Sequence, residues 1–295
     1  MFKTFRRSWE LTKVSWAILQ KDKELLAFPL MSMIGVFVIS LVFAIPLMGS
    51  GFLQSVAGDG DSGFVSYIIG IVILFFYYLA ISIVVTYSNA ALTGAVFMRF
   101  DGKDPKLSDG FAIANSHLAA IVTFAAMNAT VGVISTLIRN AGRDSNNVVG
   151  RIIASILASI IDAAWAVVTF LVVPVMVREG KGALESVKRS GQLLRDTWGS
   201  QIVGSGGIGL VFGLIAFLAF LVIGLPLFLL AAATNSSFLL FLAVLVIIVL
   251  VAGISLVGGA LNSIYRVALY HYAHDQKVEF FEEEVLRSAF TPSTA

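Results

Sequence analysis

Six long apolar segments restrict what this chain can fold into more than any other feature. A membrane-spanning helix needs about 20 consecutive apolar residues, whereas the strands of a membrane barrel alternate between apolar and polar. Of the 295 residues, 58% are hydrophobic and only 13% are charged, against about a quarter in a soluble domain. The sequence therefore predicts an all-α polytopic membrane bundle. Its six transmembrane helices are expected at about 25–48, 64–97, 111–137, 152–177, 202–232 and 238–270.

The basic residues between these segments predict which ends face the cytoplasm. Cytoplasmic loops of membrane proteins carry an excess of lysine and arginine. If both termini lie inside, the inner segments hold most of the basic residues, and the outer loops hold only Arg139, Arg143 and Arg151. We therefore expect an inner-membrane protein with both termini cytoplasmic, a single membrane domain over 1–270 and a cytoplasmic tail over 271–295.

Basic, tryptophan-bearing stretches precede the first and fifth spans. An apolar aromatic face with a basic flank is typical of a helix lying in the membrane interface, where basic side chains attract anionic lipid headgroups. The sequence predicts such cytoplasmic-side amphipathic helices, with the alternative, for residues 1–24, that the helix is docked on the protein's own core. The candidate lipid-contacting residues are Arg6, Arg7, Trp9, Trp16, Lys188, Arg189, Arg195 and Trp198.

These two stretches are also similar to each other. Residues 6–16 read RRSWELTKVSW and residues 188–198 read KRSGQLLRDTW, and they align without a gap. Each stretch leads into a pair of spans, and parallel repeats are a known way to build membrane bundles. We therefore predict three repeats of a surface helix plus a transmembrane hairpin, at 1–98, 99–177 and 178–270. The alternative is that interfacial helices converge on tryptophan and arginine for physical reasons.

Asp162 is an acidic residue near the middle of the fourth span. An ionisable group there costs roughly 3 kcal/mol on insertion scales and is a functional-site hypothesis by default. It is either a hydrogen-bonded lock of the bundle or an ion or proton site. We favour the lock, since no polar chain to either surface can be read from the sequence. A lock should tolerate Asp162→Asn, whereas Asp162→Leu should cost about 1–3 kcal/mol. Possible partners on other spans are Asn128, Asn89, Asn262 and Arg266.

The remaining motifs give no sign of an enzyme. Gly204, Gly206 and Gly209 match the dinucleotide fingerprint G-x-G-x-x-G, but that fingerprint needs a preceding strand, and here it opens a span. We expect Gly209 and Gly213 to serve close helix packing instead. The sequence has no cysteine, no H-E-x-x-H and no G-x-S-x-G. It therefore predicts no catalytic residue, metal or cofactor, and a net charge of +2 predicts no nucleic-acid partner.

Four segments of the chain carry a family resemblance. They read RSWELTKVSWAILQKDKELLAFPL, FDGKDPKLSDGFAIANS, PVMVREGKGALESVKRS and, near the end, RVALYHYA followed by LRSAF. Together they resemble a family of prokaryotic six-span membrane proteins that is catalogued as a domain of unknown function. The resemblance covers essentially the whole chain and implies an integral membrane protein with no assigned activity. More distantly, the layout resembles the membrane domain attached to some glycerophosphodiester phosphodiesterases, without their catalytic barrel.

Two functional hypotheses follow. The first is a non-enzymatic membrane protein that organises lipids, anionic ones included, or partner proteins, copies of itself among them, through its basic tryptophan-bearing helices. The second is a small transporter or channel that uses Asp162. They differ in whether the spans enclose a water-accessible path that reaches Asp162.

Overall fold

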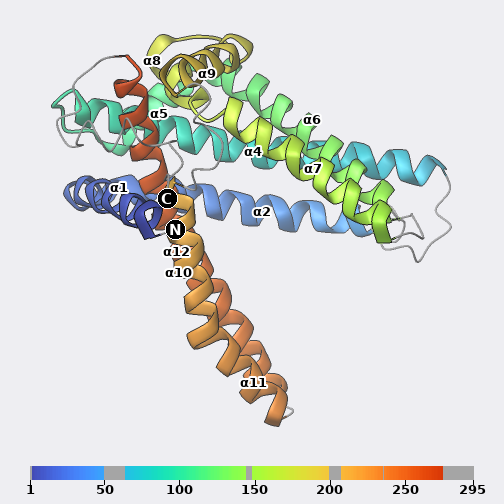
Figure 1. The fold of residues 1–295 in the computed structure, drawn as a ribbon. Helices are drawn as coiled ribbons and strands as arrows, with labels where there is room; N and C mark the ends of the chain where they lie inside the picture. Colours follow the sequence, from blue (N-terminus) through green and yellow to red (C-terminus); the bar gives the residue numbers. More distant parts are fainter. Residues whose placement is uncertain (1, 50–63, 144–147, 199–206, 235, 275–295) are drawn as a thin grey trace. The chain divides into compact units, whose positions relative to one another are not determined.

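The structure of the protein, a computed structural model, describes residues 2–49, 64–143, 148–198, 207–234 and 236–274. These residues form helices and turns, with no strand among them (Figure 1). The predicted all-α fold is therefore confirmed. Within the described ranges, six helical segments are long and apolar enough to cross a membrane. They are Lys23–Gly49, Tyr67–Phe100, Leu118–Gly142, Val148–Glu179, Ile215–Thr234 and Ser237–Tyr272.

Three helices each come before two of the six candidate spans in the chain: Phe2–Lys21, Leu107–Ser116 and Ala183–Trp198. This order is compatible with the predicted repeats, but it does not test whether the repeats superpose, and the repeat stays a prediction. The elements are α1 (Phe2–Lys21), the 3-10 turn η1 (Lys23–Leu26), α2 (Ala27–Gly49), α4 (Phe64–Phe100), α5 (Leu107–Ser116), α6 (Leu118–Arg143), α7 (Val148–Val168), α8 (Val172–Glu179), α9 (Ala183–Trp198), α10 (Gly207–Ala219), the π-turn η3 (Phe220–Gly224), α11 (Leu225–Thr234) and α12 (Ser237–Tyr272).

The chain divides into two compact units. Unit 1 consists of Met1–Met33, Ala95–Leu107 and Leu194–Ala295, and unit 2 consists of Ile34–Gly94 and Ser108–Leu193. The boundary between the units passes through α2, α4, α5 and α9, so the units do not follow the predicted repeat boundaries. Each unit is built from helices that are distant in the sequence.

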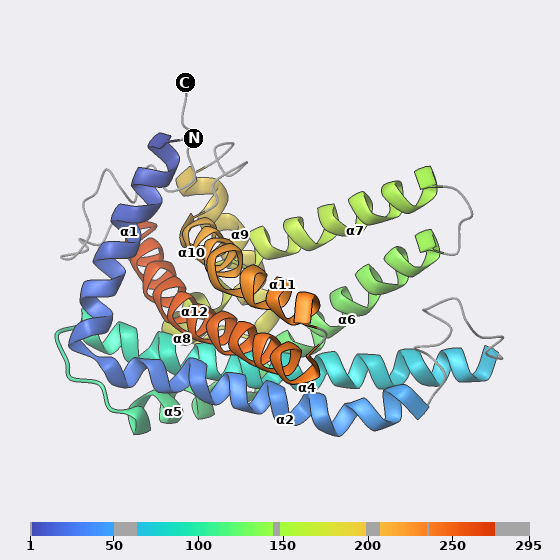
Figure 2. The same cartoon turned by 90° about the horizontal axis from the view of Figure 1, so that it is seen from below.

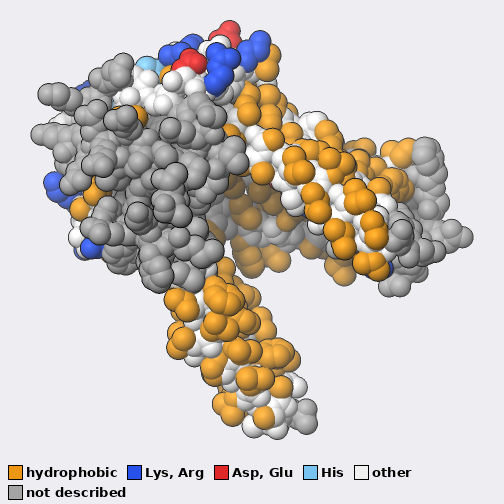
Figure 3. Space-filling view, in the orientation of Figure 1, with side chains coloured by type: hydrophobic (Ala, Val, Ile, Leu, Met, Phe, Trp, Pro, Cys, Tyr) orange, Lys and Arg blue, Asp and Glu red, His pale blue; other side chains and the backbone are white. Residues whose placement is uncertain are grey.

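In unit 1, α1 packs against α10 and α12 (Figures 1 and 2). The side chains of Ser15, Ile18 and Leu19 share one face of α1 and are buried, as helical spacing of three and four residues requires. The end of α12 is buried from Ala260 to His271, whereas its earlier large apolar side chains are largely exposed. Figure 3 shows hydrophobic side chains covering the hairpin of α10, α11 and α12, which is the surface expected of helices that face lipid.

In unit 2, α6 and α7 pack side by side as a hairpin. A second close approach joins α4 to α5, because a Cβ added to Gly94 would lie 2.8 Å from the side chain of Ile113. The buried side chains of this unit include Leu92 of α4, Ile121 of α6 and Leu171 just before α8. Small residues in α4 thus let neighbouring helices approach closely.

The third span predicted over 111–137 is broken near its start. α5 ends at Ser116, and α6 begins at Leu118. The Ser116 hydroxyl and the His117 ring Nδ1 both bond to the carbonyl oxygen of Ile113, at 2.7 and 2.8 Å. The His117 backbone N–H bonds instead to Ala114. Side chains that compete for a backbone carbonyl favour the end of a helix, which is why the predicted single helix is wrong here.

The fourth predicted span, 152–177, is also two helices, because α7 ends at Val168 and α8 begins at Val172. Pro174 has no N–H, so the carbonyl of Phe170 loses its helical donor. The Leu171 N–H donates to the hydroxyl of Ser190 in α9 at 3.0 Å. The side chains from Val172 to Met176 are buried, so α8 continues into the interior of unit 2.

Candidate functional site

Asp162 of α7 is held by two side chains of α6. The Ser135 hydroxyl donates to Oδ1 at 2.5 Å, and the Arg139 guanidinium donates to Oδ2 and forms an ion pair with the carboxylate. Ser135 and Arg139 are four residues apart, so they lie on the same stripe of α6. One helix therefore supplies both the hydrogen bond and the opposite charge that offset the cost of placing Asp162 in a span.

These partners differ from the ones expected from the sequence. Asn128 bonds to other groups, while Asn262 and Arg266 belong to α12 in unit 1 and Asn89 belongs to α4. The sequence also placed Arg139 and Arg151 in outer loops, whereas both lie within helices, because α6 continues to Arg143 and α7 begins at Val148. Two features of the sequence could have identified Arg139 as the partner of Asp162. Arg139 is an exception to the scarcity of basic residues in the outer loops, and it lies four residues after Ser135.

Further hydrogen bonds extend from this pair along α6. The Tyr78 hydroxyl of α4 bonds to the Thr136 hydroxyl at 3.1 Å. Asn128 donates to the Ser82 hydroxyl of α4 at 3.1 Å and accepts from the Trp165 indole at 2.8 Å. Asn128 and Arg139 are 11 residues apart, which corresponds to about 16 Å of helix, roughly half the thickness of the hydrocarbon layer. We call this set the polar ladder: Tyr78, Ser82, Asn128, Ser135, Thr136, Arg139, Asp162 and Trp165.

The ion pair is not sealed inside the described helices. The side chains of Arg139 and Asp162 are 43% and 41% exposed, although both residues belong to membrane-spanning helices. Charged side chains at such depth almost always face protein or a water-filled cavity rather than lipid. The polar ladder is therefore a candidate functional site as well as a structural one, and its chemistry allows either a lock or a path for protons.

A second ion-pair network, in unit 1, attaches the end of α1 to the end of α4. Arg99 donates from Nε and Nη2 to both carboxylate oxygens of Asp22, and Nη2 also donates to Asp104 at 2.7 Å. Asp22 is the residue that precedes η1, and it is only 9% exposed. A two-pronged guanidinium–carboxylate pair is stronger and more directional than a single hydrogen bond. No local sequence pattern predicted this contact between distant segments.

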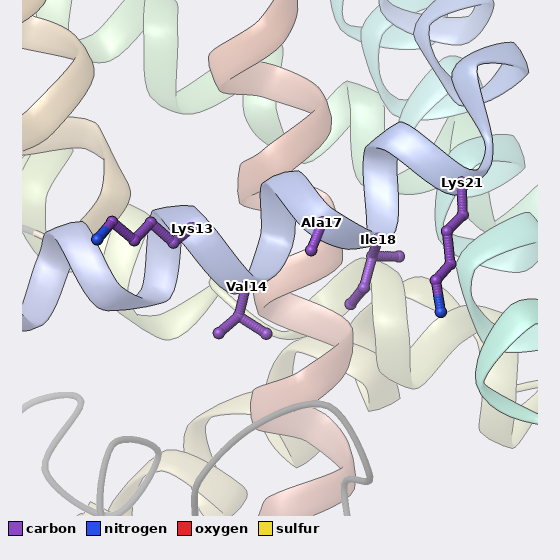
Figure 4. Close-up of a pocket in the computed structure, with 5 residues that line it drawn as sticks. All are labelled: Lys13, Val14, Ala17, Ile18 and Lys21. Atoms are coloured by element: carbon purple, nitrogen blue, oxygen red, sulfur yellow. The ribbon is translucent and has the colours of Figure 1, made fainter.

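The exposed face of α1 combines tryptophan, lysine and small apolar side chains. Trp16 is 43% exposed, whereas the neighbouring Ser15 and Leu19 are buried. A groove of about 280 Å³ runs along this helix and is lined by Lys13, Val14, Ala17, Ile18 and Lys21 (Figure 4). We call it the α1 groove. The structure describes the backbone of Arg6, Arg7 and Trp9 but not their side chains.

The helix α9 has one buried and one basic exposed face. Ser186, Val187 and Leu193 are buried, so this face is docked on the protein's own core. Lys188 and Arg195 are exposed, and Figure 3 shows lysine and arginine side chains gathered with acidic ones near α9. Lys181 and Arg189 form ion pairs with Glu179, the latter at 3.4 Å, and Arg195 with Asp196 at 3.4 Å. The structure describes the backbone of Trp198 but not its side chain.

Gly213 is one of the two glycines expected to pack α10 closely against a neighbouring helix. A Cβ added to Gly213 meets no atom within 4 Å, whereas one added to Gly258 of α12 would lie 3.0 Å from Phe212. The packing role of Gly209 and Gly213 stays a prediction. Among the described residues, no group of three or more His, Asp or Glu side chains could hold a metal ion.

A comparison with models of protein families gives a match. A protein-family model, described as a family of unknown function, matches residues 68–280, which include α9 and the whole polar ladder. No curated protein matches the chain. The more distant resemblance to the membrane domain of glycerophosphodiester phosphodiesterases stays a prediction. Because the match covers more than two thirds of the chain and six helical segments are apolar enough to cross a membrane, the protein is a multi-pass membrane protein that belongs to this family of unknown function (DUF6159).

Proposed function

We propose that this protein is a non-enzymatic membrane protein that binds anionic lipids at the cytoplasmic surface through α1 and α9. The observation that carries the proposal is the surface of α1, where Trp16 is exposed and Lys13 and Lys21 lie at the two ends of one groove. An indole ring is suited to the headgroup level of a bilayer. Each lysine near an anionic surface contributes about 1 kcal/mol of attraction.

The two sides of the membrane are part of this proposal. A chain without cysteine allows single cysteines to report orientation without a background signal. With both termini cytoplasmic, a membrane-impermeant maleimide added outside intact cells should label Gly60→Cys. The same reagent should label Lys103→Cys only after the cells are opened. The reverse pattern would place the basic helices outside and contradict the proposal.

Loss of the two groove lysines should weaken the binding of anionic lipid. Two lysines at about 1 kcal/mol each predict a roughly 30-fold lower affinity for phosphatidylglycerol in Lys13→Gln/Lys21→Gln. Native mass spectrometry of the purified protein, titrated with this lipid, measures the affinity. The matched control is Lys103→Gln/Lys106→Gln, which removes the same charge from exposed positions in the loop after α4. Equal losses in the two double variants would show a general charge effect and would sink the role of α1.

A transporter or channel is the second candidate function. It is favoured by the partial exposure of Arg139 and Asp162 and by the series of polar groups that follows them along α6. Against it, both oxygens of Asp162 already have donors, so a cation would have to displace Arg139 or Ser135. We therefore rank it below lipid binding.

A further inference from the structure

The ion pair of Arg139 and Asp162 lies at a depth where lipid solvates charge poorly. Ser135, which donates to Asp162, lies seven residues before Gly142, where its span ends, and this corresponds to about 10 Å of helix. The Asp162 carboxylate is therefore inside the hydrocarbon layer, yet its side chain is 41% exposed and that of Arg139 is 43% exposed. Exposing charge to hydrocarbon is costly, so the open side of the pair needs a cover of protein or water.

Small side chains continue this open side along α7. Ser155, Ser159, Asp162 and Ala166 follow one another at intervals of three or four residues, so they share one face of the helix, which we call the α7 face. Both serines and Ala166 are exposed. The Ser159 hydroxyl donates to the Ser155 carbonyl at 2.8 Å within the helix. Small residues at this spacing let the backbone of another membrane helix approach closely.

The remaining surface of α7 has a different character on each side. Toward α6, Ala158 is fully buried, and a Cβ added to Gly142 would clash with Ala154. Away from α6 and from the α7 face, Ile153 and Ile160 are 59% and 58% exposed, which suits contact with lipid chains. The α7 face is therefore distinct from both the packed side and the apolar side of the same helix.

We infer that the α7 face of one copy docks on the α7 face of a second copy in the membrane. The open side of the ion pair carries one charge of each sign, so it is complementary to itself under a two-fold rotation. The same bias of basic residues orients every copy, so equivalent residues lie at equal depth. The rotation brings Arg139 of each copy to Asp162 of the other. The four charges then cover one another, which no lipid chain can do.

Single cysteines test this contact, because the chain has none of its own. Ser155→Cys and Ser159→Cys lie on the α7 face, and Ile153→Cys and Ile160→Cys are matched controls on the apolar side of the same helix. In native membranes treated with copper phenanthroline, we expect the two serine variants to form disulfide-linked dimers and the two isoleucine variants to stay monomeric. Equal crosslinking of all four variants indicates random collision and overturns the inference, as does no crosslinking of any.

The role of the charges is tested by the association of the purified full-length protein in liposomes, measured by energy transfer between labelled copies as lipid is added. Arg139→Gln/Asp162→Asn removes both charge contacts between the copies and should raise the dissociation constant of the dimer roughly tenfold. Ser155→Leu keeps the ion pair but separates the helices, so it should weaken the dimer as well. Ile153→Leu on the apolar side is the control and should change nothing. Circular dichroism confirms that each variant is folded.

Two further outcomes would contradict the inference. An unchanged dissociation constant in both variants of the α7 face would show that the copies associate elsewhere. A monomeric protein whose Ser155→Cys reacts with a water-soluble maleimide would show that water covers the ion pair, which favours the transport function. Either outcome leaves lipid binding standing, because α1 and α9 are not part of the α7 face.

Discussion

Arg99→Met is expected to lower the free energy of unfolding by about 3–5 kcal/mol. The substitution keeps an unbranched apolar stem but leaves the carboxylate of Asp22 without its charged partner. Asp22 is 9% exposed, so water cannot replace the lost bonds at low cost. Because this pair attaches the end of α1 to the end of α4, we also expect α1 to become more accessible to protease.

Unfolding in detergent, followed by circular dichroism, measures this effect. Asp104→Asn is the matched control, since Asp104 bonds to the same guanidinium but its side chain is 89% exposed. That variant should change stability by at most about 1 kcal/mol. The double variant Asp22→Asn/Arg99→Met should cost less than the sum of its single substitutions, because no unpaired charge remains. If Arg99→Met costs no more than Asp104→Asn, the attachment of α1 does not depend on this pair.

Asp162→Asn is expected to destabilise the protein by about 1–3 kcal/mol. This expectation reverses the tolerance predicted from the sequence, and the reason is Arg139. An amide at position 162 keeps a group that can accept from Ser135, but it leaves the guanidinium in the span without a counter-charge. Adding Arg139→Gln should recover part of the loss, because two neutral side chains replace one unpaired cation.

Stability and proton flux measured on the same variants separate a lock from a transport site. Thr130→Val is the control within α6, because the Thr130 hydroxyl bonds to the Ala126 carbonyl of its own helix. It should stay within about 0.5 kcal/mol of the original protein. A lock predicts that Arg139→Gln/Asp162→Asn, once reconstituted in liposomes, behaves as the original protein does under a pH gradient. A folded double variant that has lost a measurable flux would make Asp162 a transport site.

The placement of the six membrane-crossing segments could be predicted because it depends on local properties. About 20 apolar residues in a row favour a membrane span wherever the rest of the chain lies. For the same reason, Asp162 could be selected from the sequence, since any ionisable residue within such a run carries a cost. The helix ends were harder to place. The breaks after Ser116 and Val168 depend on side chains that capture particular backbone groups, one of them Ser190 from another helix.

The partners of the charged side chains were decided only by the tertiary structure. Arg139 lies 23 residues from Asp162, and Arg99 lies 77 residues from Asp22, so no local pattern joins either pair. Which side chains meet depends on how one helix is rotated about its axis and how far it is shifted along its neighbour. Apolar spans pack with many combinations of rotation and shift. An ion pair and its hydrogen bonds select one of them, because any other arrangement leaves a charge unpaired in a medium that solvates it poorly. The sequence by itself determined that the chain forms apolar helices, and the tertiary structure decided which polar groups hold them together.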